Sequence, residues 1–145
     1  DGKPVYGVAS AAALALGQAE GAERVTVVGD ARRNRLWCIT YEVGPAAAQV
    51  RMPGGGLPTH TAEDFQLVPS DALGRAVPDA TRIVSADWER LEPLLRATFA
   101  AERLVARKVY PAAADLGRLA LALPASRVRE PLPIYLHPAV AAAAG

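Results

Sequence analysis

One charged run in the sequence could do chemistry: Asp30-Ala31-Arg32-Arg33-Asn34, with Arg35 directly after it. It separates two apolar stretches, "RVTVVG" and "LWCITY", which are typical of β-strands. Guanidinium groups gathered in a turn could contact RNA phosphates or an acidic partner. The same residues also suit the polar end of a hairpin, in which Asp30 caps the turn and pairs with Arg32 or Arg33. We favour this structural interpretation of Asp30, Arg32, Arg33 and Arg35, and keep the phosphate contact as the functional alternative.

Neither the histidines nor the serines form a recognisable catalytic or metal-binding pattern. His60 and His137 are the only histidines, and neither has a cysteine, an aspartate or a second histidine at the usual ligand spacing. His60 lies near Glu63 and Asp64, but a solvated polar loop is the favoured interpretation there. No serine stands in a Gly-x-Ser-x-Gly motif. We therefore predict no catalytic residue, no metal site and no cofactor.

The single cysteine and the large aromatic residues are predicted to lie in the core. Cys38 excludes an internal disulfide framework and suits a reducing cytoplasm. Trp37, Tyr41, Trp88 and Phe99 recur at strand or helix spacing, which favours packing over base stacking.

Length and composition indicate one globular domain without a strong general attraction to anions. The chain has 145 residues, 51% of them hydrophobic, and a formal net charge of +1. No apolar run approaches the roughly 18 residues of a membrane span, and residues 1–4 do not begin a signal peptide. We expect a cytoplasmic protein that does not enter the membrane.

Residues 25–41 are predicted to form a hairpin whose second strand is central in a sheet. Both of its faces carry apolar residues, as expected of a strand that is covered on two sides. One face holds Trp37, Ile39, Tyr41 and Val43, and the other holds Leu36, Cys38, Thr40 and Glu42.

The remaining elements follow from hydrophobic periodicity and from capping residues. Strands are predicted at residues 3–9, 65–68, 82–84 and 104–109. Helices are predicted at residues 10–19 and 70–76, capped by Ser10 and Ser70, at 88–99, with Pro93 delaying or kinking it, and from Pro111 onward. Residues 44–61 are expected to be a loop in which Gly54–Gly56 form a flexible connection. This order predicts a mixed α/β sheet flanked by helices, as in the ribonuclease-H-like fold and in each lobe of the actin, sugar-kinase and chaperone ATPase superfamily.

Four segments, in order, resemble the second half of the bacterial TsaB family: "KPVYGVASAAALA", "RVTVVGDARRNRLWCITY", "LVARKVYPAAADLGRLALAL" and "PIYLHP". The resemblance runs from Lys3 to about Pro138, although His137 and Leu132 depart from the family's usual arginine and glutamate. It implies that residues 1–22 are the last strand and helix of a first lobe, and that residues 23–145 are the second lobe. The rest of that first lobe, with its "GPGSFTG"-like segment, would precede Lys3, so the chain resembles an expression fragment or a trimmed protein.

The resemblance also identifies two places where active relatives of the superfamily bind nucleotide. The first hairpin turn would cradle phosphates, and a Gly-x-Gly after a later strand would lie against the adenosine. Here the turn has no glycine after Gly29, and the second position reads Val84-Ser85-Ala86-Asp87. Since a phosphate needs close approach to backbone N–H groups, we predict that this lobe does not bind ATP.

By this resemblance, the chain is a non-catalytic scaffold in making threonylcarbamoyladenosine on tRNA. Its partners would be the catalytic TsaD and the ATPase TsaE, and a glycoprotease or peptidase label would have no support from the residues. The family contacts TsaD mainly through the first lobe, so we expect this chain alone to be inactive and to bind TsaD poorly.

Two other functions stay open from the residues. One is a divergent enzyme of the sugar-kinase superfamily, which the missing glycines disfavour. The other is an RNA-binding module that uses the arginine turn and a basic edge formed by Arg103, Arg107, Lys108, Arg127 and Arg129. The apolar helix at residues 11–19 could also pair with a second copy to form a homodimer.

Overall fold

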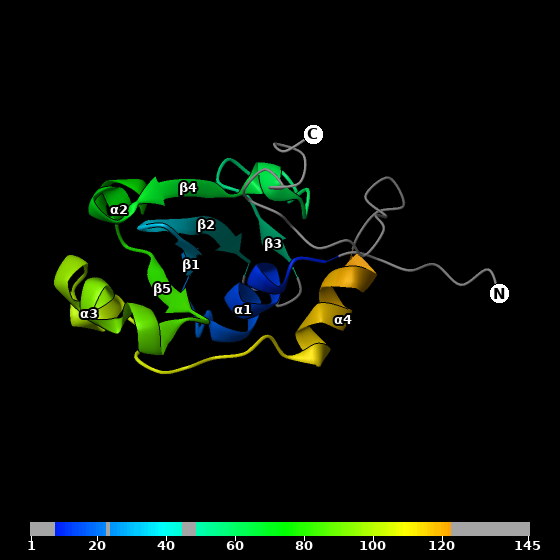
Figure 1. Cartoon of the computed structure of the whole chain (residues 1–145). Helices are drawn as coiled ribbons and strands as arrows, with labels where there is room; N and C mark the ends of the chain where they lie inside the picture. Colours follow the sequence, from blue (N-terminus) through cyan, green and yellow to red (C-terminus); the bar gives the residue numbers. More distant parts are fainter. Residues whose placement is uncertain (1–7, 23, 45–48, 123–145) are drawn as a thin grey trace, which may run out of the picture.

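The two longest strands form an antiparallel hairpin at the centre of the sheet: β1 (Arg24–Arg32) and β2 (Arg35–Val43). The computed structural model of the chain describes residues 8–22, 24–44 and 49–122. In this part of the chain, β5 (Arg82–Ser85) runs parallel to β1. The short β3 (Val50–Arg51) and β4 (Gln66–Pro69) pair antiparallel with different stretches of β2. The resulting order is β3-β2-β1-β5, with β4 also beside β2, so β2 is central as predicted (Figure 1).

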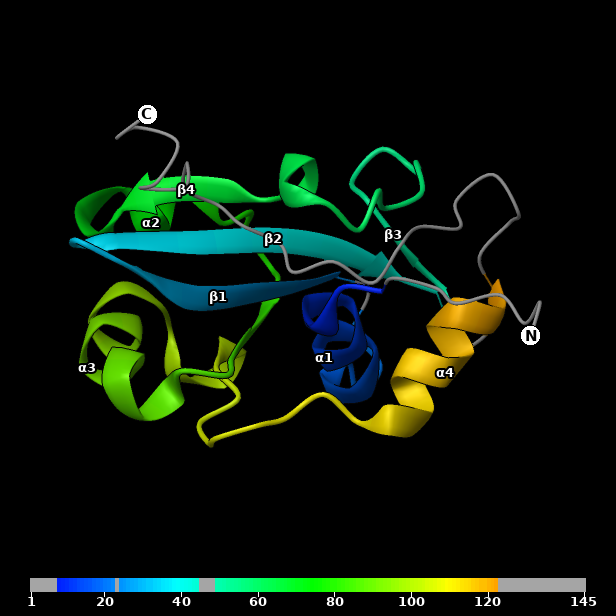
Figure 2. The same cartoon turned by 45° about the vertical axis from the view of Figure 1, so that its right-hand side comes forward.

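Helices cover both faces of this sheet. The α-helices of the described residues are α1 (Ser10–Gln18), α2 (Leu73–Ala76), α3 (Trp88–Thr98) and α4 (Ala113–Ala122). Short 3₁₀ turns occupy Ala62–Asp64, Ser70–Ala72 and Ala101–Arg103. One buried cluster joins α1 and α4 to the sheet, and a second joins α2 and α3 to it. Figure 2 shows the hairpin running across the molecule, with its turn at the end away from α4.

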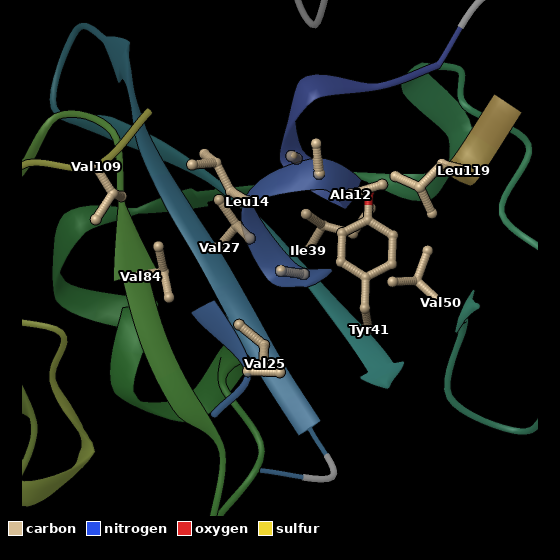
Figure 3. Close-up of a cluster of buried hydrophobic side chains, with 14 of the residues drawn as sticks. Ala12, Leu14, Val25, Val27, Ile39, Tyr41, Val50, Val84, Val109 and Leu119 are labelled. Carbon is tan, nitrogen blue, oxygen red and sulfur yellow. The ribbon is translucent and has the colours of Figure 1, made fainter. Parts of the chain in front are cut away.

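The strict alternation of β2 divides its side chains between these two clusters. Ile39 and Tyr41 lie in the first cluster with Val27 of β1, whereas Leu36 and Cys38 lie in the second. Figure 3 shows the first cluster, in which Ala12 and Leu14 of α1 lie against side chains of β1 and β2. The predicted assignment of the two faces is therefore confirmed.

Helix α1 packs closely on the sheet because its inner side chains are small. Residues Ala11–Ala15 are all buried, and Ala12 and Ala15 are fully so. Alanine lets a helix backbone approach a sheet, where a larger side chain would overpack the site. The predicted apolar helix is thus covered by the chain's own sheet and α4.

Both predicted serine caps are wrong. Ser10 is the first residue of α1, and the N-cap is Ala9, whose N–H donates to Nδ1 of His60 (3.1 Å). Ser70 likewise begins a 3₁₀ turn, and its hydroxyl donates to the carbonyl oxygen of Asn34 (3.0 Å). Neither segment has a side-chain cap, and each of these two bonds joins the segment to a residue distant in sequence.

Three further local expectations are corrected. Helix α3 begins at Trp88, five residues before Pro93, so the delayed start is wrong. The strand expected at residues 104–109 is a single bridge between Leu104 and Ile83. Helix α4 begins at Ala113, because Ala112 accepts its first hydrogen bonds, so Pro111 lies before the helix and not at its first position.

The expected loop at residues 44–61 contains β3 and a defined turn. Gly54 and Gly55 have φ of 97° and 95°, conformations that glycine adopts without steric cost. The backbone N–H of Met52 donates to the carbonyl oxygen of Gly56 (2.7 Å), and the carbonyl oxygen of Met52 accepts from the N–H of Gly55 (2.9 Å). The glycines therefore form a hydrogen-bonded turn and not a flexible connection.

Two parts of the prediction fall on residues that the structure does not describe. Residues 3–7 of the strand expected at 3–9 are among them, and so is the tail that contains Arg127, Arg129 and His137. Within the described ranges, no helix has the length and apolar character needed to span a membrane.

Candidate functional site

The charged run forms the turn of the β1–β2 hairpin. Arg32 pairs with Arg35, which leaves Arg33 and Asn34 as a two-residue turn with φ of 55° and 58°. Positive φ at both positions is the type I′ geometry that matches the twist of paired strands. Arg32 also has a positive φ, 69°, at a shift in register between Asp30 and Arg32. Three successive non-glycine residues therefore adopt a conformation that side chains disfavour.

Asp30 caps this turn, as predicted, but its ion-pair partner is a different residue. Its Oδ1 accepts from the backbone N–H of Arg32 (2.8 Å). Its Oδ2 accepts from Arg90 of α3 (3.0 Å), so the expected pairing with Arg32 or Arg33 is wrong. The N–H of Arg32 and the Arg90 guanidinium hold the pKa of Asp30 below its usual value.

Asp87 closes the same turn from the end of β5. Its Oδ2 accepts from the backbone N–H of Asp30 (2.9 Å), and its own N–H donates to Oγ of Ser85 (3.0 Å). Two backbone N–H groups of the turn, those of Asp30 and Arg32, are thus already bonded to carboxylates. A phosphate here would meet occupied donors and two negative charges, so the geometry does not suit a phosphate-binding loop.

Sequence reasoning named Asp87 only as a residue in place of a glycine, and missed Arg90. The topology of the sheet brings both residues to the turn. Because β1 and β5 are parallel, their carboxyl ends lie at the same edge of the sheet. Asp87 follows β5 and Arg90 lies in the first turn of α3, three residues later.

Gly29, the last glycine before the turn, serves packing and not phosphate approach. It lies opposite Trp37 on the neighbouring strand, and a Cβ at Gly29 would collide with the indole ring. The ring also meets Phe65 edge to face, with centroids 5.5 Å apart. The missing side chain at Gly29 therefore makes the space that Trp37 fills.

The three arginines of the run lie on the exposed side of the turn. Arg32, Arg33 and Arg35 are exposed, and within residues 8–22, 24–44 and 49–122 none of them forms an ion pair. Below them, the carbonyl oxygen of Asn34 accepts from both the N–H (3.1 Å) and the hydroxyl of Ser70 (3.0 Å). The turn is thus braced from two sides while its cations face solvent.

His60 is a buried structural residue, contrary to the expected solvated loop. Its Nδ1 accepts the N–H of Ala9 at the start of α1, which requires this nitrogen to be unprotonated. Asp64 accepts from the N–H and hydroxyl of Thr59 and from the N–H of His60. No cluster that could hold a metal is found among the described side chains.

Cys38 lies in the core as predicted, and burial raises its pKa to about 11. It contributes to a pocket of about 140 Å³. The pocket lies along the edge of β2, between the stretches that pair with β4 and with β3. It is lined by Cys38, Ile39, Thr40, Met52, Pro53, Asp64, Gln66, Ala76 and Pro78. A thiol with so high a pKa is protonated at neutral pH, so the pocket contains no activated nucleophile.

The predicted aromatic core is confirmed for Tyr41, Trp88 and Phe99, all buried, while Trp37 is half-buried. Burial, with the charge of Asp64, raises the pKa of Tyr41.

The three described residues of the basic edge all have partners within the protein. Arg103 donates to the carbonyl oxygens of Thr81 (3.1 Å) and Pro78 (2.9 Å). Arg107 bonds to Gln18 (2.7 Å), and Lys108 lies 3.9 Å from Glu89. Arg103 is thus used inside the protein, whereas Arg107 and Lys108 are about half exposed and take part in surface ion pairs.

Comparison with known proteins identifies the fold. No family model and no curated protein matches the chain. A crystal structure of an uncharacterised protein with similarity to the peptidase YeaZ from Pseudomonas aeruginosa matches with a TM-score of 0.59 and 22% identity. That match covers 93% of this chain but only 60% of the other. YeaZ from Pseudomonas aeruginosa matches at 23% identity with a TM-score of 0.47, over 80% of this chain and 47% of the other. The chain therefore shares the ribonuclease-H-like α/β fold of the YeaZ-similar protein, of whose length it spans about three-fifths.

Proposed function

We propose that this chain is the second lobe of a TsaB-like protein, a non-catalytic subunit in making threonylcarbamoyladenosine on tRNA. In this role it acts in the cytoplasm as a scaffold for the catalytic TsaD, with the ATPase TsaE as a further partner. The proposal is supported by the order of the four segments that resemble TsaB and by a fold like that of the YeaZ-similar protein.

The hydrogen bonding of the hairpin turn is the main support for a non-catalytic role. In nucleotide-binding relatives the corresponding turn offers backbone N–H groups to phosphate. Here the carboxylates of Asp30 and Asp87 accept two of those N–H groups, at 2.8 and 2.9 Å. Binding phosphate would require breaking these bonds beside two negative charges, which costs more than an open glycine turn does.

The alternative of a divergent sugar-kinase-type enzyme is disfavoured for the same reason. Such an enzyme must bind a nucleoside triphosphate. Both positions expected to contact that nucleotide contain an aspartate, Asp30 in the turn and Asp87 after β5. The pocket of about 140 Å³ lies elsewhere, along β2, and neither Asp30 nor Asp87 lines it.

The test is a chimera in which the first lobe of a TsaB-family protein is fused before this chain. We expect the chimera to capture TsaD in a pull-down and to support formation of threonylcarbamoyladenosine with TsaD and TsaE. The 145-residue chain alone should capture TsaD weakly, because the first lobe makes most of that contact. The fused first lobe without this chain serves as the control. Failure of the chimera to support tRNA modification, or ATP binding by this chain in a calorimetric titration, would contradict the proposal.

A further inference from the structure

We propose that the hairpin turn contacts tRNA through the guanidinium groups of Arg32, Arg33 and Arg35, here named the arginine tip. The contact is to phosphate groups of the RNA backbone. This inference rests on the proposed function, which supplies tRNA as the anionic partner, but its physical basis is the arrangement of charges on the turn.

No acidic side chain among the described residues forms an ion pair with the arginine tip. Asp30, the acidic residue within the turn, is bonded to Arg90 and to a backbone N–H, and Asp87 is bonded to the N–H of Asp30. Asp71, which follows Ser70 beneath the turn, forms no ion pair within the described ranges. The three guanidiniums are therefore available to an anion.

The choice of residues opposes the stability of the hairpin. Arg32 and Arg35 are directly opposite each other across the strands, and like charges at such positions destabilise a sheet. Arg32 and Arg33 also adopt positive φ, where asparagine or glycine would fit at lower cost. A turn selected only for its structure would avoid all three arginines. Unfavourable local choices of this kind are expected at binding sites, where an anionic ligand offsets the repulsion.

The turn is also held rigid, which favours binding. Bonds to Asp30, Asp87 and Ser70 fix its backbone from both neighbouring elements. A fixed backbone reduces the entropy lost when arginine side chains engage phosphate, and each guanidinium can donate two parallel hydrogen bonds to it.

The contact should be to phosphate and not to bases. The ring of Trp37, two residues after Arg35, is half-buried and packed edge to face on Phe65. It is therefore unsuited as a platform for stacked bases. Contacts of this kind position an RNA without reading its sequence.

The test is fluorescence anisotropy of this chain with a labelled, unmodified tRNA transcript at 50 to 200 mM KCl. The variant is Arg33→Asn with Arg35→Gln, which keeps residues suited to the turn. We expect it to weaken binding about tenfold at 50 mM KCl and to lower the log–log salt slope by about 1.5, at about 0.7 to 0.9 per phosphate contact. The matched control is Arg24→Gln with Arg96→Gln, which removes the same charge from two arginines paired with Glu42 and Glu92.

Thermal unfolding separates binding from folding. Because Arg35→Gln removes one of two opposed like charges, its melting temperature should equal or exceed that of the parent chain while its RNA affinity falls. A variant that lost RNA binding only through unfolding would show the opposite change in melting temperature.

The outcomes distinguish this inference from the proposed function. No binding of tRNA, an equal loss in the control, or equal competition by polyglutamate and by tRNA would overturn the arginine tip as an RNA contact. None of these would change capture of TsaD by the chimera, which does not depend on the tip. Conversely, tip-dependent tRNA binding with a chimera that does not support formation of threonylcarbamoyladenosine would reject the scaffold role and leave the RNA contact standing.

Discussion

At the scale of single residues, Asp30 determines how the charged turn is held together. It was predicted as a turn cap, and its carboxylate also pairs with Arg90, 60 positions further along the chain. The backbone N–H of Arg32 and this guanidinium both favour the ionised form, so the folded-state pKa of Asp30 is below its unfolded value. A lowered pKa means that ionised Asp30 stabilises the fold.

Replacement Asp30→Asn should lower the free energy of unfolding by about 1 kcal/mol at pH 7, as expected for a partly exposed ion pair. The difference should be complete above about pH 4, the unfolded value for aspartate, and should shrink as the pH falls through the lower folded-state pKa. Urea unfolding at several pH values measures it. Asp71→Asn is the control, since exposed Asp71 forms no ion pair with any described residue. A difference that persists at the lowest pH would contradict the account.

At the scale of elements, a hydrogen-bonded relay joins β1, β2 and the loop before β5. The hydroxyl of Thr26 contacts that of Thr40 (2.8 Å) and donates to that of Thr81 (3.3 Å), which in turn donates to the carbonyl oxygen of Pro78 (3.1 Å). Arg103 donates to the same loop at three places and lies over the ring of Phe99. The guanidinium thus connects the start of β5 to the end of α3.

Arg103→Lys should lower the free energy of unfolding by about 1 to 2 kcal/mol, because an ammonium group cannot reproduce the fork of donors that reaches Thr81 and Pro78. Chemical denaturation measures the change. The matched control is Arg96→Lys, since Arg96 also lies over an aromatic ring, that of Trp88, but makes one exposed ion pair with Glu92. We expect the control to cost less than about 0.5 kcal/mol. Equal losses in the two variants would show that the hydrogen bonds to the loop contribute nothing.

At the scale of the whole molecule, one sheet is shared by two hydrophobic clusters. Val27, Ile39 and Tyr41 belong to the cluster under α1 and α4, whereas Val28 and Leu36 of the same two strands belong to the other. If one cluster unfolds, it disturbs β1 and β2, and the same two strands contribute side chains to the other cluster. The two faces should therefore unfold together.

The fluorescence of the two tryptophans can measure whether the two faces unfold together. They are the only tryptophans in the chain, and they lie on opposite faces of the sheet. Trp37 packs on the first cluster and Trp88 belongs to the second. In the variants Trp37→Phe and Trp88→Phe, the fluorescence of the remaining tryptophan should change at the same denaturant concentration as the far-ultraviolet circular dichroism. A fluorescence midpoint separated from the dichroism midpoint in either variant would show that one face unfolds independently.

Patterns that act between near neighbours could be predicted from the sequence. Alternation with a period of two determined the hairpin and the division of β2 between two faces, and the spacing of Trp88, Leu91 and Leu95 determined α3. The order of the predicted elements indicated a mixed α/β sheet flanked by helices, which is the arrangement found. The predicted caps at Ser10 and Ser70 were wrong, since the N-cap residues are Ala9 and Pro69, and the hydroxyl of Ser70 donates to Asn34.

What only the tertiary structure decided is the pairing of polar groups that are distant in sequence. Asp87 reaches Asp30 across 57 positions and His60 reaches Ala9 across 51, and no local pattern marks either pair. The physical reason is that hydrophobic periodicity sets which face of an element is buried, whereas hydrogen bonds and ion pairs depend on which element ends the fold brings together. The sequence by itself therefore determined the strands that present the charged turn. The tertiary structure decided that carboxylates occupy its backbone donors and that its arginines face solvent.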